Sequence, residues 1–285
     1  MAIVLEESTK RDIKEWSHDL LVSSRCLDVF PTPADKLAAF INVTVSPTDL
    51  SKIQPIYLDK NDSVIKKLLG QLRGLFFREE KLIFLDRSCN LERQRFTLLH
   101  EVGHNLPWQV AAASMRADDD YTLSPEAKEQ FEAEASYFAS ETMFQGDKFS
   151  EIVKAEPLTI QTAIKVSPFF GASIHATLRR LVEFSPVRCA LLVMKDPTPT
   201  KATLRDLFHS QSFLSDIGSI EFGENLESVK YPFVESYVRR ENIGYGKFLA
   251  PVNESSIELR YEYFFNGYNG FVFSTRNKTI LIRYF

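Results

Sequence analysis

The residues His100-Glu101-Val102-Gly103-His104 are the stretch of this chain whose types and spacing could do chemistry. On a helix, side chains four positions apart lie on one face, about one turn from each other. His100 and His104 could therefore hold one Zn²⁺ together, with a third protein ligand and a water completing a tetrahedral site. Glu101 lies beside both histidines and is the candidate general base. The motif predicts an open, catalytic type of zinc site with one ion per chain.

The residues before the motif predict the element that must position it. Residues 81–86 form a short strand-like run that is apolar at its centre, and residues 87–90 form a turn. Asn90 is a suitable N-cap for a helix that starts at Leu91 and continues into the motif. Pro107 is expected to end that helix, because proline cannot continue one. The two histidines are then expected on the last two turns of a rigid helix.

A second helix is the best source of the third zinc ligand. It is expected over residues 125–144, since Ser124 is a suitable cap and Pro125 fits the first helical position. Glu134 is adjacent to the apolar stripe of this helix and has small neighbours on both sides. We therefore expect Glu134 to be the third ligand, with Glu132 and Glu141 as alternatives.

At these residues the chain resembles a known family. Residues 93–104, Arg-Gln-Arg-Phe-Thr-Leu-Leu-His-Glu-Val-Gly-His, are similar to the R-x-R-F-T-x-A-H-E-x-G-H block of the ImmA/IrrE metallopeptidases. Residues 134–143 resemble the family's E-A-N-x-F-A-x-x-L-L-M helix, whose first Glu is the third zinc ligand and falls on Glu134. The resemblance covers about residues 10–185. Ser136 replaces the family Asn, and residues 105–108 lack a His that is common there; both departures concern support of the zinc ligands.

The resemblance implies an activity and a substrate. It implies a zinc-dependent endopeptidase that cuts a cognate transcriptional repressor of the helix-turn-helix type and so relieves repression. Glu101 would take a proton from the attacking water, and an extended peptide would add to residues 82–86 as an edge strand. Tyr121, Tyr137 and His175 are unranked candidates for a second group that stabilises the oxyanion.

The alternative class is a non-catalytic protein with a structural zinc, which acts by binding DNA or a partner. Structural zinc sites are usually closed by four protein ligands, often cysteines, and the motif contains none. Direct DNA binding is also disfavoured by the formal net charge of −4.

Composition indicates an ordinary globular protein of the cytoplasm. Of the 285 residues, 44% are hydrophobic and 25% are charged, as is usual for globular proteins. The length of the chain is sufficient for one large domain or two. The N-terminal residues 1–7 are too short and acidic for a secretion signal, and no apolar run approaches a membrane span. Cys26, Cys89 and Cys189 are dispersed, as is typical of reduced thiols.

The predicted fold class is α+β with three parts. Residues 1–146 are expected to form a mostly helical, zincin-like peptidase domain with a small sheet. Residues 147–185 have helix-turn-helix proportions, and packing is favoured over DNA contact as their role. After a Ser-Pro break, residues 186–285 are expected to form an α/β or β-rich accessory domain.

Four further segments or residues have features that predict their structure. Residues 109–123 are expected to be a loop, whose acidic run at 118–120 is solvated rather than a cation site. Residues 63–72 are expected to be helical, and residues 279–285 to be a strand. His209 is expected at the surface.

Overall fold

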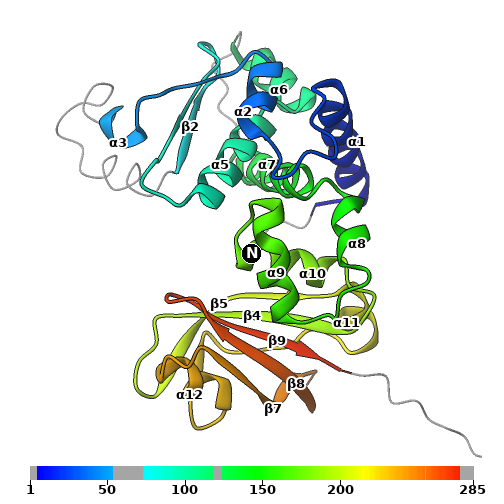
Figure 1. Ribbon diagram of the computed structural model, residues 1–285, viewed down its shortest axis with the longest axis vertical. Coiled ribbons are helices and arrows are strands. Elements are labelled where there is room, and N and C mark those ends of the chain that lie inside the picture. The colour runs from blue at the N-terminus through cyan, green and yellow to red at the C-terminus, as the bar shows by residue number, and fades with distance from the viewer. Residues whose placement is uncertain (1–4, 54–72, 118–123, 254, 277–285) are drawn as a thin grey trace, which may run out of the picture. The chain divides into compact units, whose positions relative to one another are not determined.

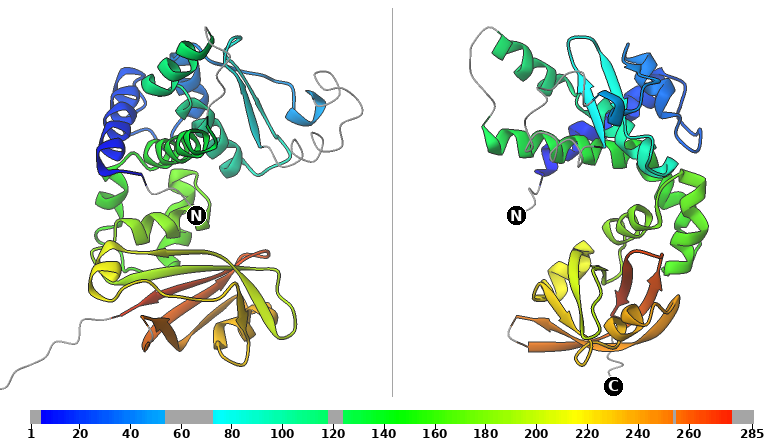
Figure 2. Two further views of the ribbon diagram at one scale, coloured as in Figure 1. Left: turned by 180° about the vertical axis from the view of Figure 1, so that it is seen from behind. Right: turned by 90° about the vertical axis from the view of Figure 1, so that its left-hand side faces the viewer.

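The computed structural model describes residues 5–53, 73–117, 124–253 and 255–276. The helix predicted over 63–72 and the strand predicted over 279–285 lie outside these ranges. The fold is α+β, as predicted, and its contacts divide the chain into two compact units. The first contains Met1–Lys154 and Ser167–Ser173, and the second contains Ala155–Val166 and Ile174–Phe285 (Figures 1 and 2).

The first unit is mainly helical. Its helices are α1 (Glu7–Ser23), α2 (Ala34–Phe40), α3 (Leu50–Ile53), α5 (Leu91–Gly103), α6 (Pro107–Ala117), α7 (Pro125–Phe144) and α8 (Asp147–Val153). The capping predictions are confirmed, because the Asn90 side chain accepts from the Arg93 N–H and the Ser124 hydroxyl accepts from the Ala127 N–H. These caps set where the two motif-bearing helices, α5 and α7, begin.

Helices α5 and α7 approach each other closely at Gly103. A Cβ atom added at Gly103 would lie 3.0 Å from the Cα of Ala135 and 2.9 Å from the ring of Phe138. Ala135 and Phe138 are both fully buried. Helix α7 also packs against α1, where the Trp16 ring lies 4.9 Å from that of Phe138. Small residues at the crossing thus allow α7 to lie directly against the motif helix.

A three-stranded sheet lies beside α5, with the strand order β1-β3-β2. Its strands are β1 (Thr44–Val45), β2 (Gly74–Phe77) and β3 (Leu82–Leu85), and β3 pairs in parallel with β1 and antiparallel with β2. The prediction that residues 82–86 form an edge strand is therefore wrong. The apolar residues of β3 are buried at the centre of the sheet, and among the described strands β2 is an edge strand that contacts α5.

Residues 107–117 also differ from the prediction. Helix α5 ends at Gly103, before Pro107 is reached, and Pro107 instead begins α6, which is allowed because the first residues of a helix need no intrahelical N–H bond. The loop predicted over residues 109–123 is therefore wrong as far as residue 117. The acidic run at 118–120 and Tyr121 lie outside the described residues.

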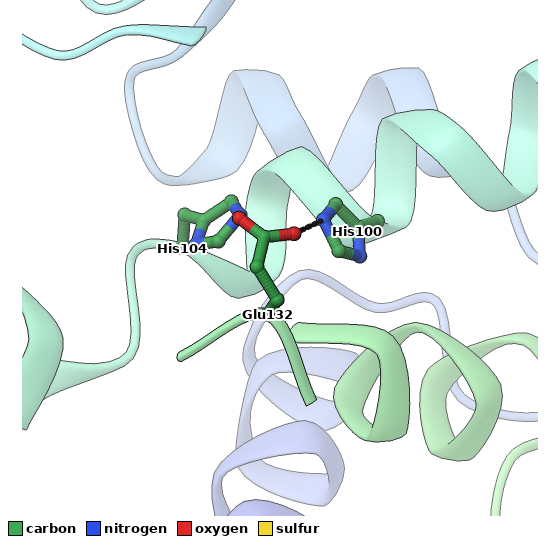
Figure 3. Close-up of side chains that lie close together, drawn as sticks. All are labelled: His100, His104 and Glu132. Atoms are coloured by element: carbon green, nitrogen blue, oxygen red, sulfur yellow. Dashed lines mark hydrogen bonds and ion pairs between the residues drawn. The ribbon is translucent and has the colours of Figure 1, made fainter. Parts of the chain in front are cut away.

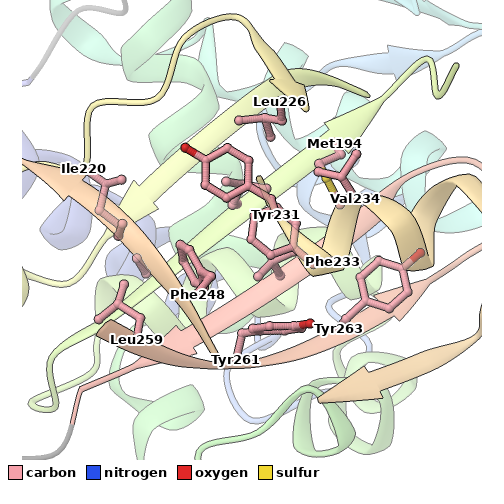
Figure 4. Packing of buried hydrophobic residues seen from close by; sticks show 14 of the residues in the cluster. Met194, Ile220, Leu226, Tyr231, Phe233, Val234, Phe248, Leu259, Tyr261 and Tyr263 are labelled. Carbon is pink, nitrogen blue, oxygen red and sulfur yellow. The ribbon is translucent and has the colours of Figure 1, made fainter. Parts of the chain in front are cut away.

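The second unit is built on a six-stranded antiparallel sheet with the order β6-β5-β4-β9-β8-β7. Its strands are β4 (Cys189–Lys195), β5 (Lys201–His209), β6 (Asn225–Glu227), β7 (Ile243–Val252), β8 (Ser255–Phe265) and β9 (Gly270–Thr275). Two short helices, α11 (Gln211–Asp216) and α12 (Pro232–Val238), belong to this unit. Its core is rich in aromatic side chains, among them Tyr231, Phe233 and Phe248 (Figure 4). The β-rich alternative for the accessory part is thus the observed one.

The helix pair expected within residues 147–185 is present as α9 (Ile160–Phe170) and α10 (Ile174–Glu183). Helix α10 packs on β4 and β5, and Arg180 is only 1% exposed with its guanidinium over the Phe184 ring. A buried arginine cannot contact DNA, which supports the packing interpretation. The contacts of α10 place it in the second unit, with the six-stranded sheet. The sequence instead predicts a domain boundary after residue 185.

His209 is not at the surface, contrary to the sequence-based expectation. Its Nε2 accepts a hydrogen bond from the Ile220 N–H at 3.1 Å, and its ring lies 5.3 Å from that of Phe213. Burial lowers the pKa of this imidazole from 6.5 to about 4. Protonation would turn the accepting nitrogen into a donor that faces another donor, so the ring is held neutral.

We predict that this histidine makes the second unit sensitive to acid. Between pH 6.5 and 4 the unfolded chain binds a proton at His209 that the folded chain does not, so stability falls as the pH falls through this window. The loss is at most on the order of 3 kcal/mol, at about 1.4 kcal/mol for each pKa unit, because solvent screening reduces it at this partly exposed ring. Denaturant unfolding of His209→Gln should show a flatter pH profile than wild type. His18→Gln, at an exposed position, is the control; equal profiles for all three proteins would contradict the prediction.

Candidate metal centre

The nitrogen atoms of His100 and His104 converge on one carboxylate, that of Glu132. His100 Nε2 lies 3.1 Å from one Glu132 oxygen and His104 Nε2 lies 3.5 Å from the other (Figure 3). His100 is on the last turn of α5 and His104 is its C-cap residue, close to the predicted position, and their rings are perpendicular with centroids 4.9 Å apart. Three potential ligand atoms, two from α5 and one from α7, thus lie close enough together to hold one metal ion.

Hydrogen bonds within this group shift the pKa values of Glu132 and His104. Hydrogen bonding to His100 and His104 lowers the pKa of the Glu132 carboxyl well below its usual range. Burial lowers the pKa of His104, but hydrogen bonds to Glu132 and Gln109 outweigh it and raise the pKa overall. Glu132 is nevertheless accessible, with 64% of its side chain exposed. The centre is therefore open to solvent on the Glu132 side, as a catalytic metal site requires.

Glu134, which the sequence favoured as the third ligand, does not face the histidines. It is 4% exposed, and its carboxylate accepts hydrogen bonds from Trp108 Nε1 at 2.7 Å, Gln109 Nε2 at 2.9 Å and Gln130 Nε2 at 3.0 Å. Residues two positions apart on a helix point about 200° away from each other, so Glu132 and Glu134 cannot share one site. The structure places Glu132, one of the two alternatives, where the sequence analysis placed Glu134.

A signal for Glu132 was present in the sequence. Glu132 and Ser136 are one turn apart and share a face of α7, and the Ser136 hydroxyl lies 3.2 Å from His100 Nδ1. The face that meets the histidines is therefore polar, whereas Glu134 is inside the packing layer. The other alternative, Glu141, is 2% exposed and lies near Gly146 at the C-terminal end of α7, outside the ligand group.

Glu101 is buried next to the edge strand β2. It is 8% exposed, and a Cβ atom added at Gly74 would lie 2.6 Å from its carboxylate oxygen. Burial raises the pKa of Glu101, although the nearby charges of His100 and His104 oppose the rise. A carboxylate whose pKa is raised is better suited to accept a proton and then return it. Glycine at position 74 is required for the strand to pass this close to the carboxylate.

A cleft of about 420 Å³ opens over the centre. Strand β2 lines it with Gly74 and Phe76, and helix α5 lines it with Phe96, Thr97 and the motif residues. Of the residues considered for oxyanion stabilisation, Tyr137 and His175 do not line this cleft. His175 instead lies in the second unit, against the rings of Phe208 and Phe271.

Comparison with protein-family models finds one family that covers this site. Residues 58–182 match the model for the IrrE N-terminal-like domain, the M78 peptidases. This match supports the assignment of the segment to the M78 family, of the ImmA/IrrE type. The family is one of metallopeptidases, and the M78 segment contains α5, α7 and the metal-ligand group that they carry.

The overall fold has a counterpart among solved structures. A chain described as a Mycobacterium tuberculosis transcriptional regulator matches with a TM-score of 0.56 over 93% of this chain and 76% of its own length. The two sequences are 12% identical, so the likeness concerns the fold alone. A comparison with curated proteins finds no match. No helix in the described part of the chain is long and apolar enough to cross a membrane.

The close crossing of the two motif helices gives a stability prediction. Gly103 is the last residue of α5, and alanine stabilises a helix by up to about 1 kcal/mol relative to glycine, the value for a helix interior. At Gly103 the added methyl would meet the backbone of Ala135, and such overpacking typically costs about 1–3 kcal/mol. We predict that Gly103→Ala lowers the free energy of unfolding by about 1 kcal/mol in denaturant titration. An increase of similar size, as helix propensity alone would give, would contradict the close approach.

Proposed function

We propose that this chain is a zinc-dependent endopeptidase whose centre is His100, His104 and Glu132 with Glu101 as the general base. One observation carries the proposal: three potential ligand atoms converge beside a buried carboxylate, and they do so in an open cleft. A structural zinc site would be closed by a fourth protein ligand. This openness favours catalysis over the non-catalytic alternative.

The residues present fit zinc. Two imidazole nitrogens and one carboxylate oxygen are a usual set of protein ligands for catalytic zinc, with the fourth position left open. We assign His100 Nε2, His104 Nε2 and a Glu132 oxygen as the ligands, so Glu132 takes the place that the sequence gave to Glu134. A zinc ion held there would act as a Lewis acid that activates water and polarises the scissile carbonyl.

Glu101 supplies the proton transfers in this proposal. Its carboxylate takes a proton from the attacking water and delivers it to the leaving amine. Burial prepares Glu101 for both steps, because it raises the pKa of the carboxyl and limits competition from bulk water. Gly74 keeps the strand close to this carboxylate, so that peptide and base meet on the same side of the cleft.

The edge strand β2 is the proposed docking strand for the substrate. The Asp86 N–H donates to the Arg73 carbonyl, which fixes the register in which alternate β2 residues pair with β3. By this alternation the backbone groups of Gly74 and Phe76 point away from β3 and toward the side of the cleft. An extended peptide could pair with them and bring a carbonyl toward the centre.

The biological substrate follows from the family resemblance. We propose a cognate helix-turn-helix repressor as the protein that is cut, with relief of transcriptional repression as the result. A cytoplasmic location is supported by the three cysteines, which are all free. Direct DNA binding by the α9–α10 pair is not part of the proposal, because Arg180 is buried and Arg179 forms an ion pair with Glu183 at 2.7 Å.

The metal assignment predicts which glutamate matters for zinc. Purified wild-type protein should hold about one Zn²⁺ per chain by metal analysis. Glu132→Ala should remove most of this zinc, because one of the three ligands is lost. Glu129→Ala changes an exposed glutamate one turn away on the same helix and should retain full occupancy. Full zinc in Glu132→Ala would show that Glu132 is not a ligand.

The base assignment predicts a separation of binding from catalysis. Glu101→Gln keeps the size of the side chain but cannot accept the proton, so cleavage of the candidate repressor should fall at least about 10²-fold. Zinc content should stay at the wild-type level. Glu79→Gln, at an exposed position, is the control and should cleave normally. Wild-type cleavage by Glu101→Gln would refute the mechanism and favour the binding alternative.

A further inference from the structure

We propose that Gln109, held in place by Glu134, fixes the tautomer of His104 that leaves Nε2 free to bind a metal. This inference rests on the metal site proposed above. It gives a role to Glu134, the buried carboxylate that is not a ligand, and to a glutamine on α6 that belongs to no motif. Both would act as positioning residues through His104.

The amide of Gln109 has only one acceptable orientation. Gln109 is fully buried, and one end of its amide lies 3.2 Å from the Phe131 carbonyl oxygen and 2.9 Å from a Glu134 oxygen. Both neighbours are acceptors, so this end must be the NH₂ group, which has two hydrogens to donate. The opposite end is then the carbonyl oxygen, and it lies 3.1 Å from His104 Nδ1.

The orientation of the amide decides where His104 carries its proton. A carbonyl oxygen can only accept, so Nδ1 of His104 must donate and must carry a hydrogen. A neutral imidazole has one N–H, which leaves a lone pair on Nε2. That nitrogen is the one directed at Glu132. The network thus selects the tautomer that a metal needs, as hydrogen bonds to the outer nitrogen of metal-bound histidines generally do.

Glu134 is suited to hold this orientation because it offers acceptors only. Three donors point at its carboxylate, from Trp108, Gln109 and Gln130. An amide of the same shape would have to place its own NH₂ group against at least one of these donors. In a Glu134→Gln protein, relief of that conflict would allow the Gln109 side-chain amide to rotate by about 180°. Its NH₂ group would then face His104.

The second histidine has no comparable constraint. His100 Nδ1 lies 3.2 Å from the Ser136 hydroxyl, which can either donate or accept. The tautomer of His100 is therefore not determined by this contact. The proposed control is specific to His104, and the variants that disturb it should leave His100 unaffected.

The first test is zinc affinity, measured in the full-length protein by competition with a chelator. Glu134→Gln and Gln109→Leu should each weaken binding about 10- to 100-fold, the usual range for lost support of a ligand histidine. Trp108→Phe is the matched control. It removes a donor to Glu134 but keeps both oxygens that accept from the Gln109 NH₂ group, those of Phe131 and Glu134. It should bind zinc with wild-type affinity within about threefold. Equal losses in all three variants would indicate general loosening and overturn the proposal.

The second test observes the tautomer itself, without a metal. ¹⁵N chemical shifts of the His104 ring would be measured in a Glu132→Ala background, which removes the competing carboxylate, at a pH where the ring is neutral. The proposal predicts a hydrogen on Nδ1 in this protein and in the Trp108→Phe derivative. It predicts a large gain of the Nε2–H form after Gln109→Leu or Glu134→Gln.

Together the two tests distinguish a failure of the tautomer proposal from a failure of the proposed metal site. If wild-type protein binds no zinc, the metal site is wrong, yet the tautomer result still stands because it is obtained without metal. If wild-type protein binds zinc but the Nε2–H form already predominates in the Glu132→Ala protein, the tautomer proposal is wrong. The assignment of the metal site still stands in that case. Unchanged shifts in Gln109→Leu would overturn the proposal in the same way.

Discussion

The crossing of α5 and α7 determines how the polar side chains of the first unit meet. Because Gly103 has no side chain and Ala135 has a small one, the helix backbones come close enough for Glu132 to reach both motif histidines. The same contact sets the rotation of α7 about its own axis. With that rotation fixed, Glu132 and Ser136 face the histidines while Glu134 turns into the packing layer. The metal centre is thus a consequence of helix packing.

The locally encoded parts of this arrangement could be predicted from the sequence. Asn90 and Ser124-Pro125 begin helices by satisfying their own backbone N–H groups, so α5 and α7 begin where the local residues indicate. The position of both histidines at the C-terminal end of α5 followed from the same reasoning. The resemblance to the M78 peptidases also rested on short contiguous blocks, and the family comparison agrees with it.

The parts that depend on contacts between distant segments could not be predicted in the same way. Glu132 and Glu134 both flank the apolar stripe of α7, and only the crossing with α5 decides which of them meets the histidines. Strand β3 has the same apolar pattern whether it is central or at an edge, and its partner β1 comes from far upstream. His209 looked isolated because its partner, the Ile220 N–H, lies beyond the end of the strand.

The division into two units separates the proposed chemistry from the large sheet. Within the described residues the ligand group and Glu101 belong to the first unit, whereas the aromatic core and His209 belong to the second. The most direct test of the account is anomalous diffraction at the zinc edge from crystals of the zinc-loaded protein. The account predicts a single zinc peak bound by His100, His104 and a Glu132 oxygen, with Glu134 hydrogen-bonded to Gln109 away from the metal. A zinc peak on Glu134, or one closed by a fourth protein ligand, would contradict it.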